Sequence, residues 1–261
     1  MCMRMGPMVQ QVFDIDFRGD AFIFPTETSP DHIRAIMRKS GNFYEKRLLE
    51  FLCSRMDGAT WVIDCGANIG NHTIFMAGVL QRHVVAFEPI PSNLDALRAA
   101  VALNGLSHSV TVEPYAVSDT VGQVTLGMEF AGNPGSFSIG SGDQSHTVLA
   151  VTLDGHFQKG VPSGRLGILK VDVEGHEEHV LRGAMALIQN HRPMVICEAG
   201  TMTAFERIEA FLAPIGYHAA RVFGRTPTVV FDRVERISSE RDKIVEKIAH
   251  YVLQHEQAPA G

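Results

Sequence analysis

The sequence lacks three features that define large classes of protein. It has no excess of positive charge, because 23 Lys and Arg residues stand against 29 Asp and Glu residues and leave a formal net charge of −6. The broad positive field that binds a nucleic-acid backbone is therefore absent. No apolar run approaches the roughly 20 residues of a membrane span, and Arg4 is followed by no apolar stretch of signal-peptide length. We expect a cytoplasmic protein that binds neither nucleic acid nor membranes.

Cysteine is also scarce. The four cysteines form no C-x-x-C pair, and Cys65 and Cys197 lie inside apolar runs that indicate buried strands. We interpret the cysteines as reduced thiols of the core. The composition is that of a globular protein, with 45% hydrophobic and 20% charged residues. A chain of 261 residues is long enough for one large α/β domain with an appended segment.

Residues 1–57 are predicted to form a hairpin and two helices that serve as a lid. Residues 12–24 alternate apolar and polar side chains around Gly19, which is typical of a short β-hairpin. A helical pattern begins near Ser29, and apolar residues at helical spacing indicate a second helix that reaches Leu52.

Residues 58–235 carry the rhythm of a parallel sheet covered by helices. Short apolar runs alternate with longer helical stretches, which is the β-α-β signature of a sheet that is buried on both faces. The predicted strands are residues 61–65, 84–87, 110–112, 168–173 and 194–197. The predicted helices are residues 71–80, 92–104, 177–188 and 204–212. The fold class is therefore α/β.

The remaining patterns complete the predicted sheet and its surroundings. A further strand is expected at residues 122–128, and the Gly- and Ser-rich loop at residues 132–145 is the most mobile candidate region. Residues 217–223 and 228–231 indicate an antiparallel hairpin at one edge of the sheet. Residues 236–261 hold a helix with one apolar stripe and a tail. That stripe must pack on something, and a homo-oligomer formed through this helix is one solution.

The first strand of the main domain runs into a turn that predicts a nucleoside-binding loop. Gly66 and Gly70 lie between that strand and a helix, where missing Cβ atoms let a ligand approach the backbone. Asn68 occupies the middle glycine position of G-x-G-x-x-G, so a dinucleotide is disfavoured. Glu88 ends the next strand and can accept hydrogen bonds from both ribose hydroxyls of an adenosine. The alternative is an ordinary tight turn with a solvated strand end.

Four segments of the chain together resemble the FkbM family of methyltransferases: V-I-D-C-G-A-N-I-G-N-H-T, V-A-F-E-P-I-P-S-N, Y-A-V-S-D and L-K-V-D-V-E-G-H-E-E. The resemblance implies a Rossmann-like class I methyltransferase fold, with a mostly parallel seven-stranded sheet and S-adenosylmethionine as methyl donor. Glu45 lies in G-N-F-Y-E, which is similar to a G-x-x-E element of the family but one residue longer. The implied cofactor residues are Glu45, Asp64, Gly66, Asn68, Gly70, Glu88, Asn93, Ala116, Val117, Ser118, Asp119 and Asp172.

The strand at residues 168–173 is expected to deliver the reaction chemistry. Alternation along a strand places Lys170, Asp172 and Glu174 on one side. For a hydroxyl acceptor, Asp172 or Glu174 can take the proton, and Lys170 can orient or neutralise these carboxylates. A divalent cation held by Asp172, Glu174 and His176 is a less favoured alternative.

These inferences predict an S-adenosylmethionine-dependent methyltransferase that acts on a small-molecule hydroxyl, and the resemblance points to a sugar or a natural product. Two alternatives keep the same fold. An N-methyltransferase would need no strong base if its amine arrived neutral, and a non-catalytic adenosine-binding module would have lost turnover. The presence of Asp172, Glu174 and Glu177 together argues against the second. Asn68 argues against a third alternative, an NAD-dependent oxidoreductase.

Overall fold

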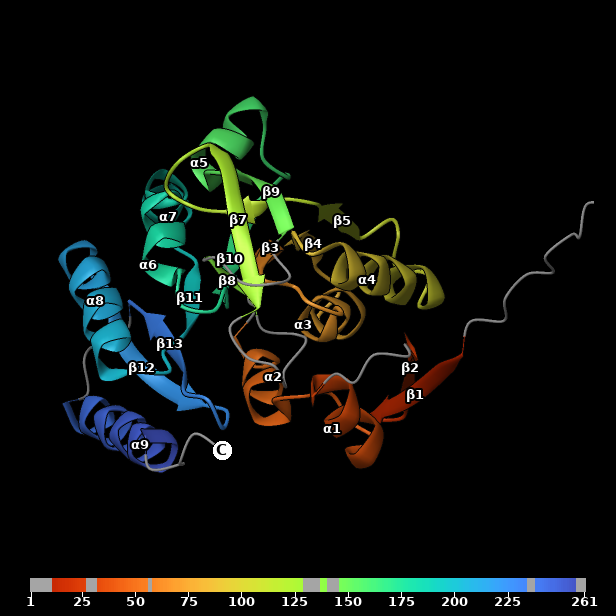
Figure 1. Cartoon of the computed structure of the whole chain (residues 1–261), viewed down its shortest axis with the longest axis horizontal. Helices are drawn as coiled ribbons and strands as arrows, with labels where there is room; N and C mark the ends of the chain where they lie inside the picture. The colour runs from red at the N-terminus through yellow and green to blue at the C-terminus, as the bar shows by residue number, and fades with distance from the viewer. Residues whose placement is uncertain are drawn as a thin grey trace, which may run out of the picture.

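The computed structural model describes residues 11–26, 32–55, 58–128, 137–139, 146–233 and 238–256. At its centre lies a seven-stranded sheet with the strand order β12-β13-β11-β10-β3-β4-β5 (Figure 1). Strands β10, β11, β3, β4 and β5 are parallel, whereas β13 pairs antiparallel with β11 and with β12. The α/β class and the antiparallel edge hairpin are confirmed. The strands are β3 (Ala59–Cys65), β4 (His83–Phe87), β5 (Val110–Glu113), β10 (Arg165–Val171), β11 (Met194–Glu198), β12 (His218–Phe223) and β13 (Thr228–Asp232).

Alternate side chains of the central strands enter two hydrophobic cores, one on each face of the sheet. In β3, Val62 enters one core, while Trp61 and Ile63 enter the other. Because both faces are covered, such strands read as nearly continuous apolar runs, which is why the sequence predicted them. Cys65 and Cys197 are fully buried free thiols, as expected.

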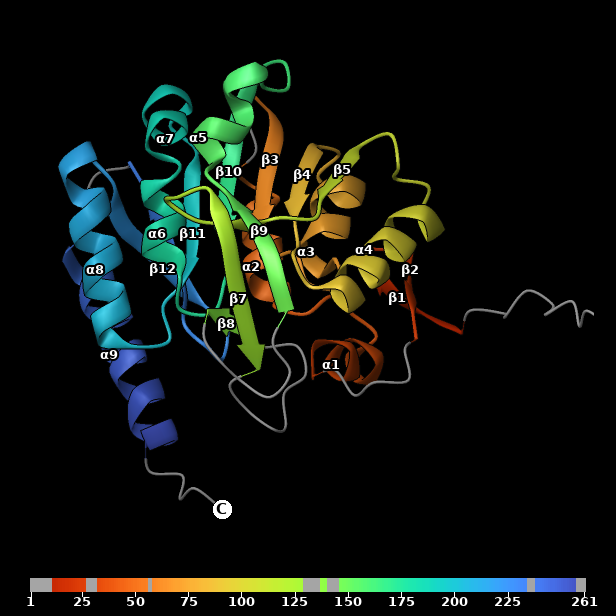
Figure 2. The same ribbon diagram turned by 45° about the horizontal axis from the view of Figure 1, so that its top comes forward.

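Helices pack on both faces of the sheet, as the two views show (Figures 1 and 2). The helix predicted at residues 71–80 is one α-helical turn, α3, followed by a π-helix, η1. Within the described residues, no helix is both long and apolar enough to cross a membrane. The helical elements are α3 (Asn71–Ile74), η1 (Phe75–Val79), α4 (Pro91–Leu103), α5 (Leu153–His156), the 3₁₀ turn η2 (Phe157–Lys159), α6 (Glu177–Arg182), α7 (Met185–His191), α8 (Met202–Leu212) and the 3₁₀ turn η3 (Ala213–Ile215).

The single helix predicted at residues 177–188 is wrong, because the structure has α6 and α7 in its place. The break falls at Gly183, whose backbone packs so closely on Ser118 that an added Cβ would lie 2.1 Å from the carbonyl oxygen. The carboxylate of Asp154 then accepts a hydrogen bond of 2.8 Å from the backbone N–H of Ala186. A carboxylate on the first free N–H groups starts a new helix.

The N-terminal segment has the predicted hairpin and two helices, and it shares a hydrophobic core with one face of the sheet. The rings of Phe43 and Phe75 pack edge to face with centroids 5.2 Å apart. Phe22 lies so close to Gly78 that an added Cβ would be 2.6 Å from its ring. The segment is therefore fixed against η1. Its elements are β1 (Val12–Phe17), β2 (Asp20–Pro25), α1 (His32–Ser40) and α2 (Lys46–Leu52).

A second sheet stands beside the central one, with the strand order β6-β9-β7-β8. Its strand β7 (Gly122–Met128) was predicted, whereas β6 (Ala116–Val117), β8 (Phe137–Ile139) and β9 (His146–Val151) were not. The predicted loop at residues 132–145 lies outside the described residues except for β8, so its mobility stays a prediction.

The C-terminal helix α9 (Ser238–Glu256) packs on β12 and α8 of the same chain. Ile244 and Ile248 of its predicted apolar stripe are buried in the second core, and Val245 and Val252 pack against it. These four residues of the stripe are therefore covered within the chain, whereas Ile237 lies outside the described residues. A homo-oligomer formed through this helix stays a prediction.

Candidate functional site

A cavity with about 960 Å³ of empty space, part of it open to solvent, lies at the carboxyl edge of the central sheet. Its walls come from the loop after β3, the segment after β4, strand β6, the turn after β10, and Tyr44 of the N-terminal segment. Open α/β sheets bind their ligands at this edge. The predicted cofactor loop lies between Gly66 and Gly70, and the chemistry turn is the turn after β10 that holds Asp172 and Glu174. Both line this one cavity.

The cofactor loop is packed tightly against the end of β10. Gly66 has a φ of +76°, and a Cβ added to it would lie 1.8 Å from the backbone oxygen of Asp172. Gly70 has a φ of +95°, and its added Cβ would lie 2.8 Å from a methyl group of Leu97. Backbone packing therefore demands a glycine at residue 66, and the positive φ favours one at residue 70. The approach of a ligand to these glycines stays a prediction.

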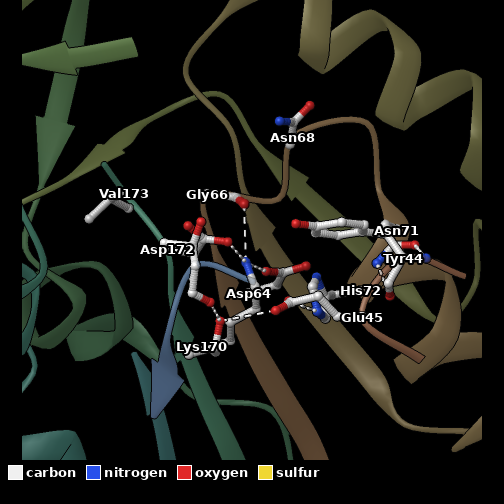
Figure 3. Close-up of polar contacts among 12 residues, drawn as sticks. Tyr44, Glu45, Asp64, Gly66, Asn68, Asn71, His72, Lys170, Asp172 and Val173 are labelled. Carbon is white, nitrogen blue, oxygen red and sulfur yellow. Dashed lines mark hydrogen bonds and ion pairs between the residues drawn. The ribbon is translucent and has the colours of Figure 1, made fainter. Parts of the chain in front are cut away.

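Asn68 stands at the tip of this loop, apart from the other polar side chains (Figure 3). Its backbone adopts the left-handed conformation, with a φ of 51°. Its side-chain Oδ1 is buried, and within the described residues it has no hydrogen-bond partner. Because leaving a buried polar atom unpaired costs about 1–3 kcal/mol, a ligand that donates a hydrogen bond here would be favoured. This open acceptor fits a nucleoside in the cavity.

Glu88 holds the loop from the end of β4. Its Oε2 accepts a 2.8 Å hydrogen bond from the backbone N–H of Asn68, and its Oε1 accepts one of 2.9 Å from Ile90. Asn93 also hydrogen-bonds to this carboxylate. Burial raises the pKa of Glu88 to about 7, although these hydrogen bonds act in the opposite direction. A carboxylate has about four acceptor positions, so Glu88 retains about one for a ribose hydroxyl.

The residues predicted beside the adenine divide into two pairs. Ala116 and Val117 line the cavity, whereas Ser118 and Asp119 lie outside its walls. The hydroxyl of Ser118 lies 2.9 Å from Nε2 of His176, which is itself a wall residue. Ser118 is thus placed to fix one wall of the cavity.

Lys170 is buried between two carboxylates behind the cofactor loop (Figure 3). Its Nζ lies 3.1 Å from Oδ1 of Asp64 and 3.3 Å from Oδ2 of Asp172. Burial alone would lower the pKa of Lys170, but the charges of Asp64 and Asp172 outweigh burial and raise it. Asp64 also accepts a 2.6 Å hydrogen bond from Thr73 and does not line the cavity. Lys170 is therefore a fixed cation that forms ion pairs with both carboxylates.

The chemistry turn begins earlier than predicted, because β10 ends at Val171 and not at residue 173. Glu174 is left-handed, with a φ of 55°, so strand alternation does not determine its direction. Even so, the turn brings its carboxylate back, and oxygen atoms of Asp172, Glu174 and Glu198 all lie within 4.8 Å of one another. Asp172 and Glu174 line the cavity. Asp172 and Glu174 thus converge through the turn, and Lys170 contacts Asp172 of this pair.

Glu177 shapes that turn. It is 4% exposed, and its Oε1 accepts hydrogen bonds from the backbone N–H groups of Val173 at 3.2 Å and Gly175 at 3.0 Å. Both N–H groups lie beyond the end of β10, where the strand-to-strand hydrogen bonds have stopped. The carboxylate of Glu177 supplies the acceptor that a neighbouring strand would otherwise provide. The sequence analysis named Glu177 together with Asp172 and Glu174 as a sign of catalysis. In the structure its carboxylate holds the backbone of the turn.

Glu198 is the site residue that sequence reasoning missed. It ends β11, beside β10, and its carboxyl group hydrogen-bonds to Asp172. Burial, and then the charges of Asp172 and Glu174, raise its pKa well above the ordinary value. It takes the place predicted for His176, whose ring lies beside Ser118. A charged residue directly after a buried strand was the signal that could have found it.

Glu45 and Tyr44 join the N-terminal segment to the sheet. The carboxylate of Glu45 lies 3.2 Å from Nε2 of His72 and accepts a 3.0 Å hydrogen bond from Thr228. Asn71 accepts a 2.9 Å hydrogen bond from the backbone N–H of Tyr44 and donates one of 3.2 Å to its carbonyl (Figure 3). Glu45 does not line the cavity, and a contact with the cofactor stays a prediction.

The sheet order, the loop after its first strand and the cavity at its carboxyl edge are those of a class I methyltransferase fold. The chain matches the family model described as the methyltransferase FkbM domain over residues 64–219, which is more than half of its length. The chain belongs to this family of methyltransferases.

Individual relatives agree with this assignment. The hexuronic acid methyltransferase AglP of Haloferax volcanii is 31% identical over 137 residues, which are 51% of this chain and 53% of that protein. The methyltransferase sdnD of Sordaria araneosa is 25% identical over 227 residues, which are 72% of this chain and 86% of that protein. Two of the curated relatives, AglP and methyltransferase 1 of Beauveria bassiana, are spanned over only 53% and 58% of their length.

A solved structure shares the fold. The crystal structure of the methyltransferase FkbM from Methylobacillus flagellatus superposes with a TM-score of 0.50 and 19% sequence identity. The likeness covers 66% of this chain and 43% of that chain. At this identity it supports the architecture and no particular substrate.

Proposed function

We propose that this protein transfers a methyl group from S-adenosylmethionine to a hydroxyl of a small molecule, a sugar or a natural product. One observation carries the proposal: the cofactor loop and the carboxylates of Asp172 and Glu174 line the same cavity. A donor held by the loop would therefore present its methyl group beside side chains that can accept a proton. The AglP relative, by its name, methylates hexuronic acid, which supports a sugar-like acceptor.

The residues of the chain have separable tasks in this proposal. Asn68 and Glu88 bind the nucleoside part of the cofactor, with Ala116 and Val117 beside the base. S-adenosylmethionine supplies, when bound, an electrophilic methyl group. Asp172 or Glu174 accepts the acceptor's proton, because methyl transfer otherwise demands mainly that the reacting atoms be held in line at near-attack distance. A cytoplasmic location and the absence of nucleic-acid and membrane partners stay predictions.

Ligand-dependent stability tests the class of cofactor. A ligand that binds only the native state raises its apparent stability, so S-adenosylmethionine and S-adenosylhomocysteine should raise the melting temperature, and NAD should not. Transfer of labelled methyl to hydroxyl and amine acceptors, measured against pH, then separates O- from N-methylation. Stabilisation by NAD alone would contradict the proposal.

We expect Glu88→Ala to weaken S-adenosylhomocysteine binding by about 1.5 to 3 kcal/mol, because it removes charged hydrogen-bond acceptors. The measurement is calorimetric titration of the folded variant. Asp95→Ala is a matched control, because Asp95 is an exposed carboxylate of α4 and should leave the affinity unchanged. An unaltered affinity in Glu88→Ala would remove Glu88 from the cofactor site.

The same carboxylate predicts a pH dependence. Because the pKa of Glu88 is about 7, the group is ionised above that pH and gains a proton below it. If the ionised form binds the ribose, affinity is full above pH 7 and falls by up to about tenfold per unit as the pH is lowered further. Titrations at pH 6 and pH 8 should show this difference in the parent protein and lose it in Glu88→Gln.

A further inference from the structure

A second groove lies on the other side of Tyr44 from the cofactor cavity. It has about 960 Å³ of empty space, much of it open to solvent, and runs between α1, the segment before α2 and the β12–β13 turn at Arg225. Tyr44 lines both the groove and the cavity. The two spaces are therefore neighbours that share one aromatic side chain.

Tyr44 connects the groove with the carboxylates of the cavity. Its ring extends from the side of Asn71 towards Gly66 (Figure 3). Burial raises the pKa of Tyr44, the negative charges of Glu45 and then of Asp172 raise it further, and the guanidinium of Arg225 acts against this shift. Of these charged residues, Asp172 lines the cavity, whereas Glu45 and Arg225 line the groove.

The groove is positively charged, although the chain as a whole carries a net charge of −6. Lys46 and Arg225 line it, and both side chains are exposed. The one acidic side chain of its wall, Glu45, is 7% exposed and is engaged with His72. An anion that enters the groove therefore meets exposed positive charges. Among the residues that line the groove, no exposed carboxylate would repel that anion.

The cations of the groove are available for a ligand. Lys46 pairs with Glu50 at 4.0 Å, but both side chains are nearly half exposed, and such pairs contribute about 0–1 kcal/mol. Within the described part of the chain Arg225 makes no ion pair, and its planar guanidinium can bind a carboxylate or phosphate through two hydrogen bonds.

We propose that this groove is the acceptor subsite, and that the acceptor is an acidic sugar whose carboxylate or phosphate binds Arg225 and Lys46. The reacting hydroxyl then points past Tyr44 towards Asp172. This inference rests on the proposed function, because it takes the bound sugar to be the molecule that is methylated. The binding itself can be tested without any methyl transfer.

The test is calorimetric titration of the free protein and of the protein loaded with S-adenosylhomocysteine. The probes are D-glucuronate, D-glucose 6-phosphate and neutral D-glucose. At least one acid should bind about tenfold or more tightly than glucose, and the one that does so identifies the acidic group. Arg225→Gln and Lys46→Gln should each weaken that acid about tenfold, which is about 1.4 kcal/mol, while S-adenosylhomocysteine affinity stays unchanged.

Arg98→Gln is the matched control, because Arg98 is an exposed residue of α4 that lines neither space. It removes the same charge and should leave acid binding unaltered. Three results would overturn the inference: no preference for either acid over glucose, no loss in the Arg225 and Lys46 variants, or an equal loss in Arg98→Gln. Acid binding without methyl transfer would instead keep the groove and refute the proposed function.

Discussion

Lys170→Met is expected to lower the free energy of unfolding by about 3 to 5 kcal/mol, because it leaves buried carboxylate charge without its counter-charge. Lys170 is 3% exposed and lies within 3.3 Å of carboxylate oxygens of both Asp64 and Asp172. Asp64 is fully buried, and Lys170 holds its pKa below the ordinary value against the effect of burial. Urea denaturation of the parent protein and the variant measures the difference.

A second variant separates lost charge from lost packing. Asp64→Asn in the Lys170→Met background removes the carboxylate that the first change left unpaired, so part of the stability should return. Lys46→Met is the surface control, since its ion pair with Glu50 is nearly half exposed, and its cost should be below about 1 kcal/mol. If Lys170→Met costs no more than Lys46→Met, the buried ion pairs do not hold the sheet and loop together.

The central sheet could be predicted because its strands obey one strong rule. Strands buried on both faces are continuous apolar runs, so Trp61 and Val62 are equally apolar although they enter different cores. Strands β6 and β8 are only two and three residues long and have no such signature. Strand β9 ends in the apolar run at residues 148–151, which the sequence analysis did not assign to a strand. β9 is partly exposed along most of its length, and its pairing with β7 depends on contacts that are distant in sequence.

The predicted helix boundaries were wrong where a contact with a distant part of the chain determines them. The break at Gly183 results from its packing on Ser118 and from the carboxylate of Asp154, both far away in sequence. Periodicity alone cannot report either contact. The early end of β10 is instead accompanied by a local contact, because Glu177 accepts hydrogen bonds from the backbone N–H groups of Val173 and Gly175, only four and two residues away.

The candidate site was predictable in its residue types and less so in their contacts. Asp172 and Glu174 could be named because they follow a buried strand at the carboxyl edge. That Lys170 would also pair with Asp64 of β3, and that Glu198 of β11 would approach Asp172, depends on which strands neighbour β10. Local sequence does not determine the order of strands in a parallel sheet. The cluster of three carboxylates, those of Asp172, Glu174 and Glu198, could therefore be recognised only in the folded structure.

Asp172→Asn and Glu174→Gln should identify the proton acceptor of the reaction. Both variants keep the shape of the side chain and remove its basic oxygen, so the one that replaces the base should lower kcat by about 100- to 10,000-fold. S-adenosylhomocysteine affinity should change much less, because the cofactor loop after β3 is untouched. Glu178→Gln is the control, since Glu178 pairs with Arg182 on α6 and does not line the cavity.

Single-turnover methylation, measured beside S-adenosylhomocysteine binding, distinguishes the remaining explanations. Normal turnover in both variants would refute the assignment of these carboxylates to catalysis. Lost cofactor binding with normal turnover at saturation would move them to the cofactor site. Activity that Mg²⁺ partly restores, together with inactivation of the parent protein by a chelator, would show that Asp172, Glu174 and Glu198 hold a divalent cation. Loss of kcat alone, insensitive to metal, would leave proton transfer as their task.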